Sequence, residues 1–316
     1  MRRGEPTGGA MPSSNDVIFI AVALTLVVAP LLFGASGWIS ARRNSNATTA
    51  GPTRWNWRLS VVSALLYTLA FNLTFFIQEF FLVLPKAFTP GLRVTLFHNN
   101  HAWEGDNPLA ALFQGTGALA TFCMAIACIA LVRADVARSR MLRLWLIWMA
   151  YCGAFMALPQ VVIGALSGAS DVGMAMNFLG LGATAKTLCA LAALGALPIF
   201  ASWLRSPLLG LAGDAMDVRS ERARSRFVFQ IATLPALCAI VLIIPFRVPR
   251  EFVEVALLPA VVTLIGIVWI QAGAWRAKPA TLVHDSSKVL IAPVLAVVVL
   301  LLLIFQLVLR PGIRFY

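Results

Sequence analysis

Eight long apolar runs dominate this sequence of 316 residues. Each run is long enough to cross a bilayer whose hydrocarbon core is about 30 Å thick, because a helix rises about 1.5 Å per residue. With 60% hydrophobic and only 12% charged residues, the chain is predicted to be an all-α, polytopic membrane bundle of about eight transmembrane helices. The predicted spans cover residues 17–39, 59–84, 109–132, 141–166, 178–204, 227–245, 252–275 and 289–309.

The chain is predicted to form one transmembrane domain over residues 17–311, with a disordered tail over residues 1–16 before it. Met11 is an alternative to Met1 as the native start. The first apolar run is longer than the core of a signal peptide, so we expect it to be retained as a helix. No internal repeat is visible, so the sequence does not indicate an inverted-repeat transporter.

The distribution of basic residues predicts how the bundle is oriented. Most lysines and arginines follow the first, third, fifth and seventh runs, whereas the loop after the second run carries only Lys86 and Arg93. The positive-inside rule therefore puts both termini outside and the loop over residues 85–108 on the outer, periplasmic side of a bacterial inner membrane. The net charge of +12 is spread over short loops, so we expect the lipid bilayer rather than nucleic acid as the partner.

Four strongly polar residues lie at a similar depth in four consecutive spans, roughly 8 to 12 Å below the outer surface. They are Glu79, Gln114, Gln160 and Lys186. A charge in hydrocarbon normally faces the bundle interior and is paired, so we expect an ion pair between Glu79 and Lys186. The candidate pocket residues around this layer are Gln78, Gln114, Gln160, Asn72, Asn99 and Asn100. The alternative is that these side chains only hold the helices together by hydrogen bonds.

The loop over residues 85–108 contains two histidines three residues apart, His98 and His101. If this segment forms a helical turn, both can reach one metal ion, and Glu79, Glu104 or Asp106 can complete a set suited to Zn or Fe. The candidate metal ligands are therefore His98, His101 and Asp106. Two alternatives remain, which are acid–base use without a metal and a loop at the membrane surface whose histidines hydrogen-bond the backbone.

The leading hypothesis for function is a metal-dependent membrane enzyme that acts on a lipid-linked or other membrane substrate. Its candidate catalytic residues are Glu79, Lys186 and Glu104. One alternative is an accessory subunit of a larger complex, which would contact a membrane-protein partner through the last span. Another is a proton-coupled transporter that uses Glu79 and Lys186 as a relay. No motif for nucleotide binding or for a serine nucleophile is present.

Overall fold

The computed structural model describes residues 13–43, 55–137, 139–213, 218–278 and 289–316. Most of the expected N-terminal tail lies outside these ranges, as do both candidate start residues. Within the tail, a helix already begins at Ser14, because the side chain of Ser13 accepts a hydrogen bond from the Asp16 backbone N–H and caps it.

The protein is mostly helical, at 78%, and the described ranges contain eight helices that are long and apolar enough to cross a membrane. This confirms the predicted all-α bundle at the level of helix content and number. The helical segments are α1 (Ser14–Ala23), η1 (Leu24–Val28), α2 (Ala29–Arg43), α3 (Trp57–Ala87), α4 (Leu109–Phe113), α5 (Thr116–Arg133), α6 (Arg140–Leu166), α7 (Asp171–Phe178), α8 (Ala183–Leu209), α9 (Glu221–Val228), η4 (Phe229–Thr233), α10 (Leu234–Arg247), η5 (Val253–Leu257), α11 (Leu258–Gly273), η6 (Ala274–Arg276), α12 (Ile291–Leu303) and η7 (Ile304–Leu309).

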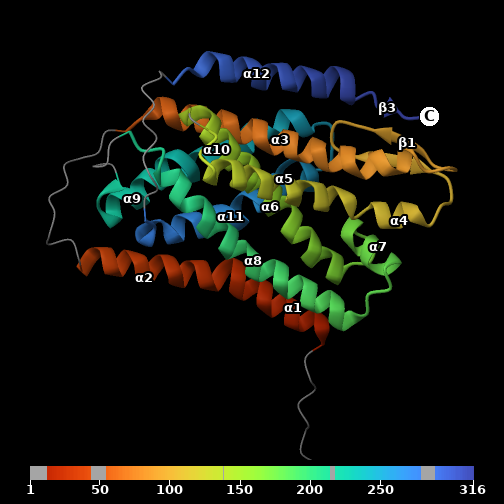
Figure 1. Ribbon diagram of the computed structural model, residues 1–316, viewed down its shortest axis with the longest axis horizontal. Coiled ribbons are helices and arrows are strands. Elements are labelled where there is room, and N and C mark those ends of the chain that lie inside the picture. The colour runs from red at the N-terminus through yellow and green to blue at the C-terminus, as the bar shows by residue number, and fades with distance from the viewer. Residues whose placement is uncertain (1–12, 44–54, 138, 214–217, 279–288) are drawn as a thin grey trace, which may run out of the picture.

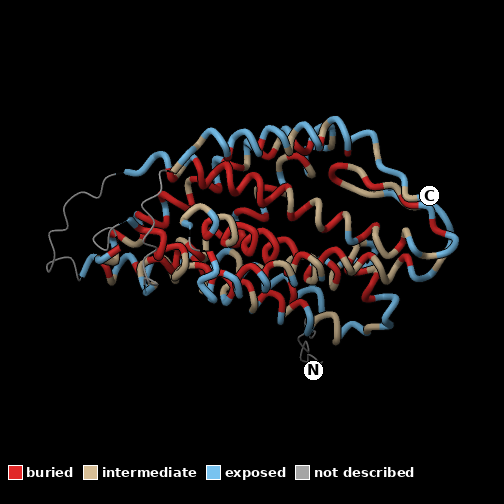
Figure 2. The backbone as a smooth tube through the Cα atoms, turned by 45° about the horizontal axis from the view of Figure 1, so that its top comes forward, coloured by how far each residue is buried: buried red, intermediate tan, exposed pale blue. Residues whose placement is uncertain are grey.

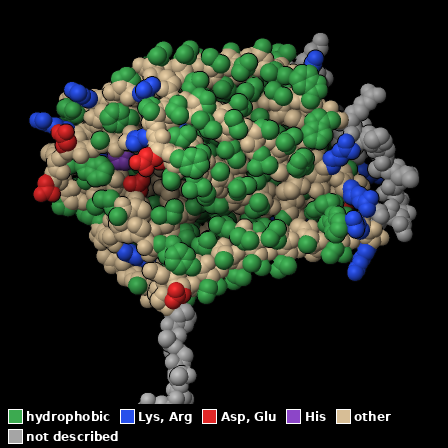
Figure 3. Space-filling view, turned by 180° about the vertical axis from the view of Figure 1, so that it is seen from behind, with side chains coloured by type: hydrophobic (Ala, Val, Ile, Leu, Met, Phe, Trp, Pro, Cys, Tyr) green, Lys and Arg blue, Asp and Glu red, His purple; other side chains and the backbone are tan. Residues whose placement is uncertain are grey.

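Helices α3 and α6 form the centre of the bundle. They are the most buried of the eight spans, since 78% and 72% of the residues in their apolar stretches are buried. Helices α1 and α2 lie along one side, and α12 lies along the opposite side (Figure 1). In these two peripheral spans, only 11% and 17% of the residues in the apolar stretches are buried (Figure 2). Apolar side chains cover the middle of the surface, while charged side chains gather towards the two ends (Figure 3). This is the surface expected of a protein surrounded by lipid.

Buried aromatic side chains fill the bundle between α3, α6 and α11. Tyr67, Trp148 and Tyr151 are all fully buried. The hydroxyl of Tyr67 lies 2.7 Å from the hydroxyl of Thr263, and the indole N–H of Trp148 donates to the Ser63 hydroxyl over 3.0 Å. The polar atoms of this layer are therefore satisfied within the protein, as an apolar surrounding requires.

A small sheet stands at one end of the bundle. Strands β1 (Arg93–Leu96) and β2 (His101–Glu104) form an antiparallel hairpin, and the C-terminal strand β3 (Ile313–Arg314) pairs with the other edge of β1. Val94 and Leu96 alternate with more exposed residues and pack on the apolar end of α3. The helical turn that would let His98 and His101 share one metal ion does not form, because β1 and β2 make a hairpin in this segment.

Gly105 closes the base of the hairpin in a conformation that other residues rarely adopt. Its φ is +111°, and a Cβ atom there would lie 1.9 Å from the carbonyl oxygen of Gly91. Glycine is thus required both by the backbone and by the close approach of the two strand ends. The reversal of the chain at residues 97–100 leads β2 back along β1, which places His101 beside α3.

Candidate functional site

The site is built on one face of α3. Asn72, Glu79 and Lys86 follow one another at intervals of seven residues, so all three lie on the same side of the helix. Glu79 and Lys86 are 5% and 0% exposed. Helix α3 therefore carries a carboxylate and an ammonium group into the protein interior, where both require partners.

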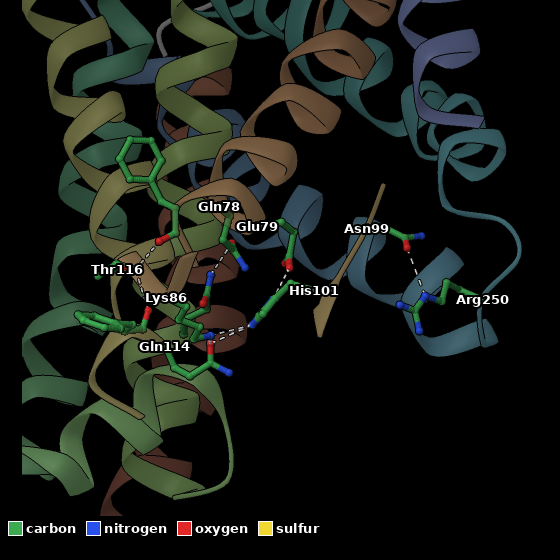
Figure 4. A network of polar contacts seen from close by, with 11 residues as sticks. Gln78, Glu79, Lys86, Asn99, His101, Gln114, Thr116 and Arg250 are labelled. Carbon is green, nitrogen blue, oxygen red and sulfur yellow. Dashed lines mark hydrogen bonds and ion pairs between the residues drawn. The ribbon is translucent and has the colours of Figure 1, made fainter. Parts of the chain in front are cut away.

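Glu79 is paired with His101 of the hairpin. A carboxylate oxygen of Glu79, Oε2, lies 2.8 Å from the ring atom Nδ1 of His101, and each side chain is 7% exposed. On the other side of the ring, Nε2 lies 3.1 Å from Nζ of Lys86 and 3.1 Å from Oε1 of Gln114. Lys86 also donates to Gln114 Oε1 over 2.8 Å. Figure 4 shows the imidazole held between these groups.

The chemistry of the partners assigns the protons of the His101 ring. A carboxylate only accepts hydrogen bonds and an ammonium group only donates them, so neutral His101 donates from Nδ1 to Glu79 and accepts at Nε2 from Lys86. Both ring nitrogens therefore have a partner, which fixes the orientation of the imidazole.

Trp103 completes the surroundings of Lys86. Its ring lies 4.2 Å from Nζ of Lys86 and stacks on the His101 ring, with centroids 5.5 Å apart and an angle of 17°. An ammonium group over an indole face is stabilised by the charge distribution of the ring. His101 and Trp103 point to the same side of β2 because they are two residues apart in the strand.

The predicted ion pair between Glu79 and Lys186 is wrong. Lys186 instead donates a hydrogen bond to the side-chain oxygen of Asn177. The error comes from the helix ends, since α8 begins at Ala183 rather than at residue 178, and Lys186 consequently lies in its first turn. Helix α3 in turn continues through Pro85 to Ala87, so Lys86 lies on this helix and not in the loop. Lys86 is the buried cation of the site, in contact with His101 and Gln114.

A cavity of about 540 Å³ opens beside Glu79, between α3, α6, α7 and the segment from η5 to α11. Most of its wall is apolar, including Phe75, Phe155, Pro159 and Ile163. The polar residues in its wall are Gln78, Glu79, Asn99, Gln160, Ser170, Asp171, Arg247 and Glu254. This combination of apolar walls with a few polar groups is typical of a ligand site.

Two of these polar residues join neighbouring helices, and a third has a shifted pKa. The amide of Gln160 on α6 donates to Oε1 of Gln78 over 2.8 Å. Asp171 begins α7, and burial together with the nearby Glu79 raises its pKa. Gln78, Gln160 and Asn99 were predicted for the pocket and do line it, whereas Asp171 and Arg247 were missed.

The tip of the hairpin contacts the loop between α10 and η5. The side-chain amide of Asn99 donates to the Arg247 carbonyl over 2.8 Å, and Nε of Arg250 donates to Oδ1 of Asn99 over 3.2 Å. His98 is 5% exposed, and neither of its ring nitrogens has a hydrogen-bond partner in the described chain. Burial, followed by the charge of Arg250, lowers the pKa of His98 to about 4.

The predicted metal ligands do not come together. His101 faces Glu79, while His98 lies at the hairpin tip near Arg250. The described residues contain no group of three or more His, Cys, Asp or Glu side chains that could hold a metal ion. The physical reason is the hairpin, because residues 98 and 101 lie on its tip and on its second strand and not on one helical turn.

The remaining predicted residues lie outside the cluster. Glu104 and Asp106 are exposed, and Glu104 projects from the face of β2 opposite to His101 and Trp103. The side-chain amide of Asn72 donates to the Thr68 carbonyl within α3. The backbone carbonyl of Asn100 accepts the hydrogen bond that closes the hairpin tip.

Comparisons of the chain with models of protein families, with curated proteins and with solved structures found no match.

Exchange of Lys86 for methionine is expected to lower the free energy of unfolding by about 2 to 4 kcal/mol, because it leaves the buried Glu79–His101 pair without its cation. Lys186→Met is the matched control and should change it by less than about 1 kcal/mol, since Lys186 has only a partly exposed hydrogen bond. Thermal unfolding of both variants in detergent measures the difference. Equal losses would show that Lys86 does not stabilise the site.

The thermal stability of the protein should decrease as the pH falls from about 6.5 to about 4. In the unfolded chain, His98 takes up a proton near its usual pKa of 6.5, whereas the folded protein keeps it neutral down to about 4. Protonation thus favours the unfolded state in this window, and the contribution of His98 is fully present only above it. His98→Gln should flatten the dependence of the melting temperature on pH. An unchanged slope in this variant would contradict the assignment.

Proposed function

We propose that the protein is a multi-pass membrane enzyme that takes a lipid-like substrate into the cavity and transfers a proton through Glu79 and His101. One observation carries this proposal. The carboxylate of Glu79 is part of the cavity wall and is also hydrogen-bonded to His101 over 2.8 Å. A titratable group that faces a cavity and is backed by a second one is a good candidate for acid–base chemistry.

In this mechanism, Glu79 exchanges a proton with the substrate, and the groups behind it compensate the change in charge. His101 donates to the ionised carboxylate from Nδ1, and Lys86 and Gln114 hold the opposite edge of the ring. Such fixed hydrogen bonds need no reorganisation during the reaction. The proposal gives no role to Zn or Fe, because His98 and His101 face different partners.

The position of the cavity supports a substrate that reaches it from the bilayer. Val253, Leu257 and Val261 belong to its wall and are themselves 57%, 47% and 43% exposed on the outer surface of the bundle. These side chains would face hydrocarbon in a membrane. A ligand with a long apolar portion can enter between them without crossing water.

Two features favour this enzyme over the alternatives of a transporter and an accessory subunit. Tyr67, Trp148 and Tyr151 fill the bundle next to the cavity, which would close a path from the cavity through the protein. In addition, Gln306, the polar residue of the last span, donates to the carbonyls of Pro245 and Val248 within the same chain. It is therefore not a free handle for another subunit.

The proposed orientation places the hairpin and the cavity on the periplasmic side of the inner membrane, with both termini outside. A membrane-impermeant maleimide should then label Glu104→Cys in intact cells and Arg222→Cys only after permeabilisation. Both side chains are exposed and lie at opposite ends of the bundle. The wild-type protein, which already contains five cysteines, gives the background. The reverse labelling pattern would overturn this orientation.

The catalytic proposal is tested by comparing Glu79→Gln with Glu104→Gln, which removes the same charge from an exposed position. Membranes of a strain that lacks the gene provide the lipid extract, and mass spectrometry measures its conversion by purified protein. The wild type and Glu104→Gln should convert a lipid species, and Glu79→Gln should do so at least about 100-fold more slowly. Full activity of Glu79→Gln would contradict the role of the carboxylate.

A further inference from the structure

The cavity contains a buried arginine that the acid–base mechanism does not use. Arg247 lies at the end of α10 and is 2% exposed, and its guanidinium carbon is 4.1 Å from the centre of the Phe75 ring. Its Nε donates to the Glu254 carbonyl over 2.6 Å. No carboxylate of the described residues forms an ion pair with it, and none of their side chains or carbonyls accepts a hydrogen bond from its terminal nitrogens.

A buried guanidinium without an anionic partner is energetically unfavourable, because desolvation is not offset by a paired charge. Arg247 belongs to the cavity wall, so an anionic group of a ligand could supply that partner. A guanidinium has five N–H groups in a planar fork, which suits phosphate and carboxylate oxygens. Only one of the five is used by the Glu254 carbonyl.

The surroundings of Arg247 hold it in place and add positive charge. Asn99 fixes the Arg247 backbone through the carbonyl and also accepts from Arg250. The pKa of the buried His98 ring is lowered by the positive charges of Arg250, Arg247 and Arg310, which favours the neutral ring. The hairpin tip and the start of the loop after α10 therefore form a cationic end of the cavity.

The cavity wall also contains three carboxyl groups, those of Glu79, Asp171 and Glu254. Glu79 is already paired with His101. The pKa of Asp171 is raised by burial and by Glu79, which favours its neutral form. Glu254 is 3.4 Å from Arg250, with which it forms an ion pair. The nearest acidic groups are thus partnered or shifted toward neutrality, whereas Arg247 is not.

We propose that Arg247 binds the phosphate of a phospholipid-type amphiphile whose hydrocarbon chain lies along the apolar wall near Pro159, Ile163 and Val261. This inference rests on the proposed use of the cavity for a lipid-like substrate and names its head group. Phosphate is favoured over carboxylate because it offers three acceptor oxygens and more negative charge to the N–H groups of Arg247 that have no partner among the described residues. The volume of about 540 Å³ lies within the range of small-molecule sites.

The test is a binding measurement that needs no turnover. Lysophosphatidic acid and a monoacylglycerol with the same chain are titrated into the purified full-length protein in dodecyl maltoside by calorimetry. The wild type should bind lysophosphatidic acid at least about 10-fold more tightly. Arg247→Gln should weaken that binding by about 10- to 100-fold and leave monoacylglycerol unaffected. Arg93→Gln, which removes an exposed arginine of β1, is the control and should match the wild type.

A second pair of variants tests the cavity even if Arg247→Gln does not fold. Val261→Trp fills the apolar wall from the lipid side and should weaken the binding of lysophosphatidic acid by about 10-fold or more. Val241→Trp places the same bulk on an exposed position of α10 outside the cavity and should have no effect. Inorganic phosphate, which has no chain, should bind far more weakly than lysophosphatidic acid.

Each outcome separates this inference from the catalytic proposal. Glu79→Gln should retain the binding of lysophosphatidic acid, since the carboxylate does not hold the phosphate. Activity that survives in Glu79→Gln while Arg247→Gln loses binding would overturn the acid–base role alone. Equal affinity of the wild type for the two lipids, or unchanged binding in a folded Arg247→Gln and in Val261→Trp, would overturn the phosphate site alone.

Discussion

The pairing of Glu79 with His101 is the interaction on which the hairpin end of the structure depends. A carboxylate on a central helix of an apolar bundle is stable only if donors surround it. Helix α3 supplies Lys86 two turns later, but the imidazole has to come from another segment. The chain after α3 therefore folds back as a hairpin, and Gly105 permits the close approach of the two hairpin ends.

The hairpin is fixed from three directions, which keeps His101 in place. Strand β3 adds to its free edge, so the C-terminus of the last span stabilises the sheet. At the tip, Asn99 bonds the end of α10. Gln306 of η7 supports this contact indirectly, since it donates to the carbonyls of Pro245 and Val248 at the end of α10. Segments far apart in sequence thus hold one ring in a fixed position.

The sequence predicted the eight helices well because hydropathy measures directly what the bilayer demands. It placed Glu79, Gln114 and Gln160 in one polar layer, since depth follows from helical rise. It named Gln78 and Asn99 as candidate pocket residues, and both line the cavity. The prediction was wrong where a helix and its apolar run end at different residues. Lys186 was predicted as the buried cation of the site, whereas the structure has Lys86 there. The seven-residue spacing of Asn72, Glu79 and Lys86 was a usable signal. Nothing in the sequence indicated that Arg247 is buried, because an arginine beside a turn normally faces water.

The two polar parts of the cavity constrain what a substrate would look like. Arg247 lies over Phe75, and Glu79 follows Phe75 by four residues on the same helix. Residues four apart on a helix are separated by about 6 Å, so the anion site and the acid–base group are neighbours. A proton that Glu79 exchanges would then belong to a group a few bonds from the phosphate. In the proposed mechanism, the reaction therefore takes place in the head-group region of the lipid, and the hydrocarbon chain serves for binding.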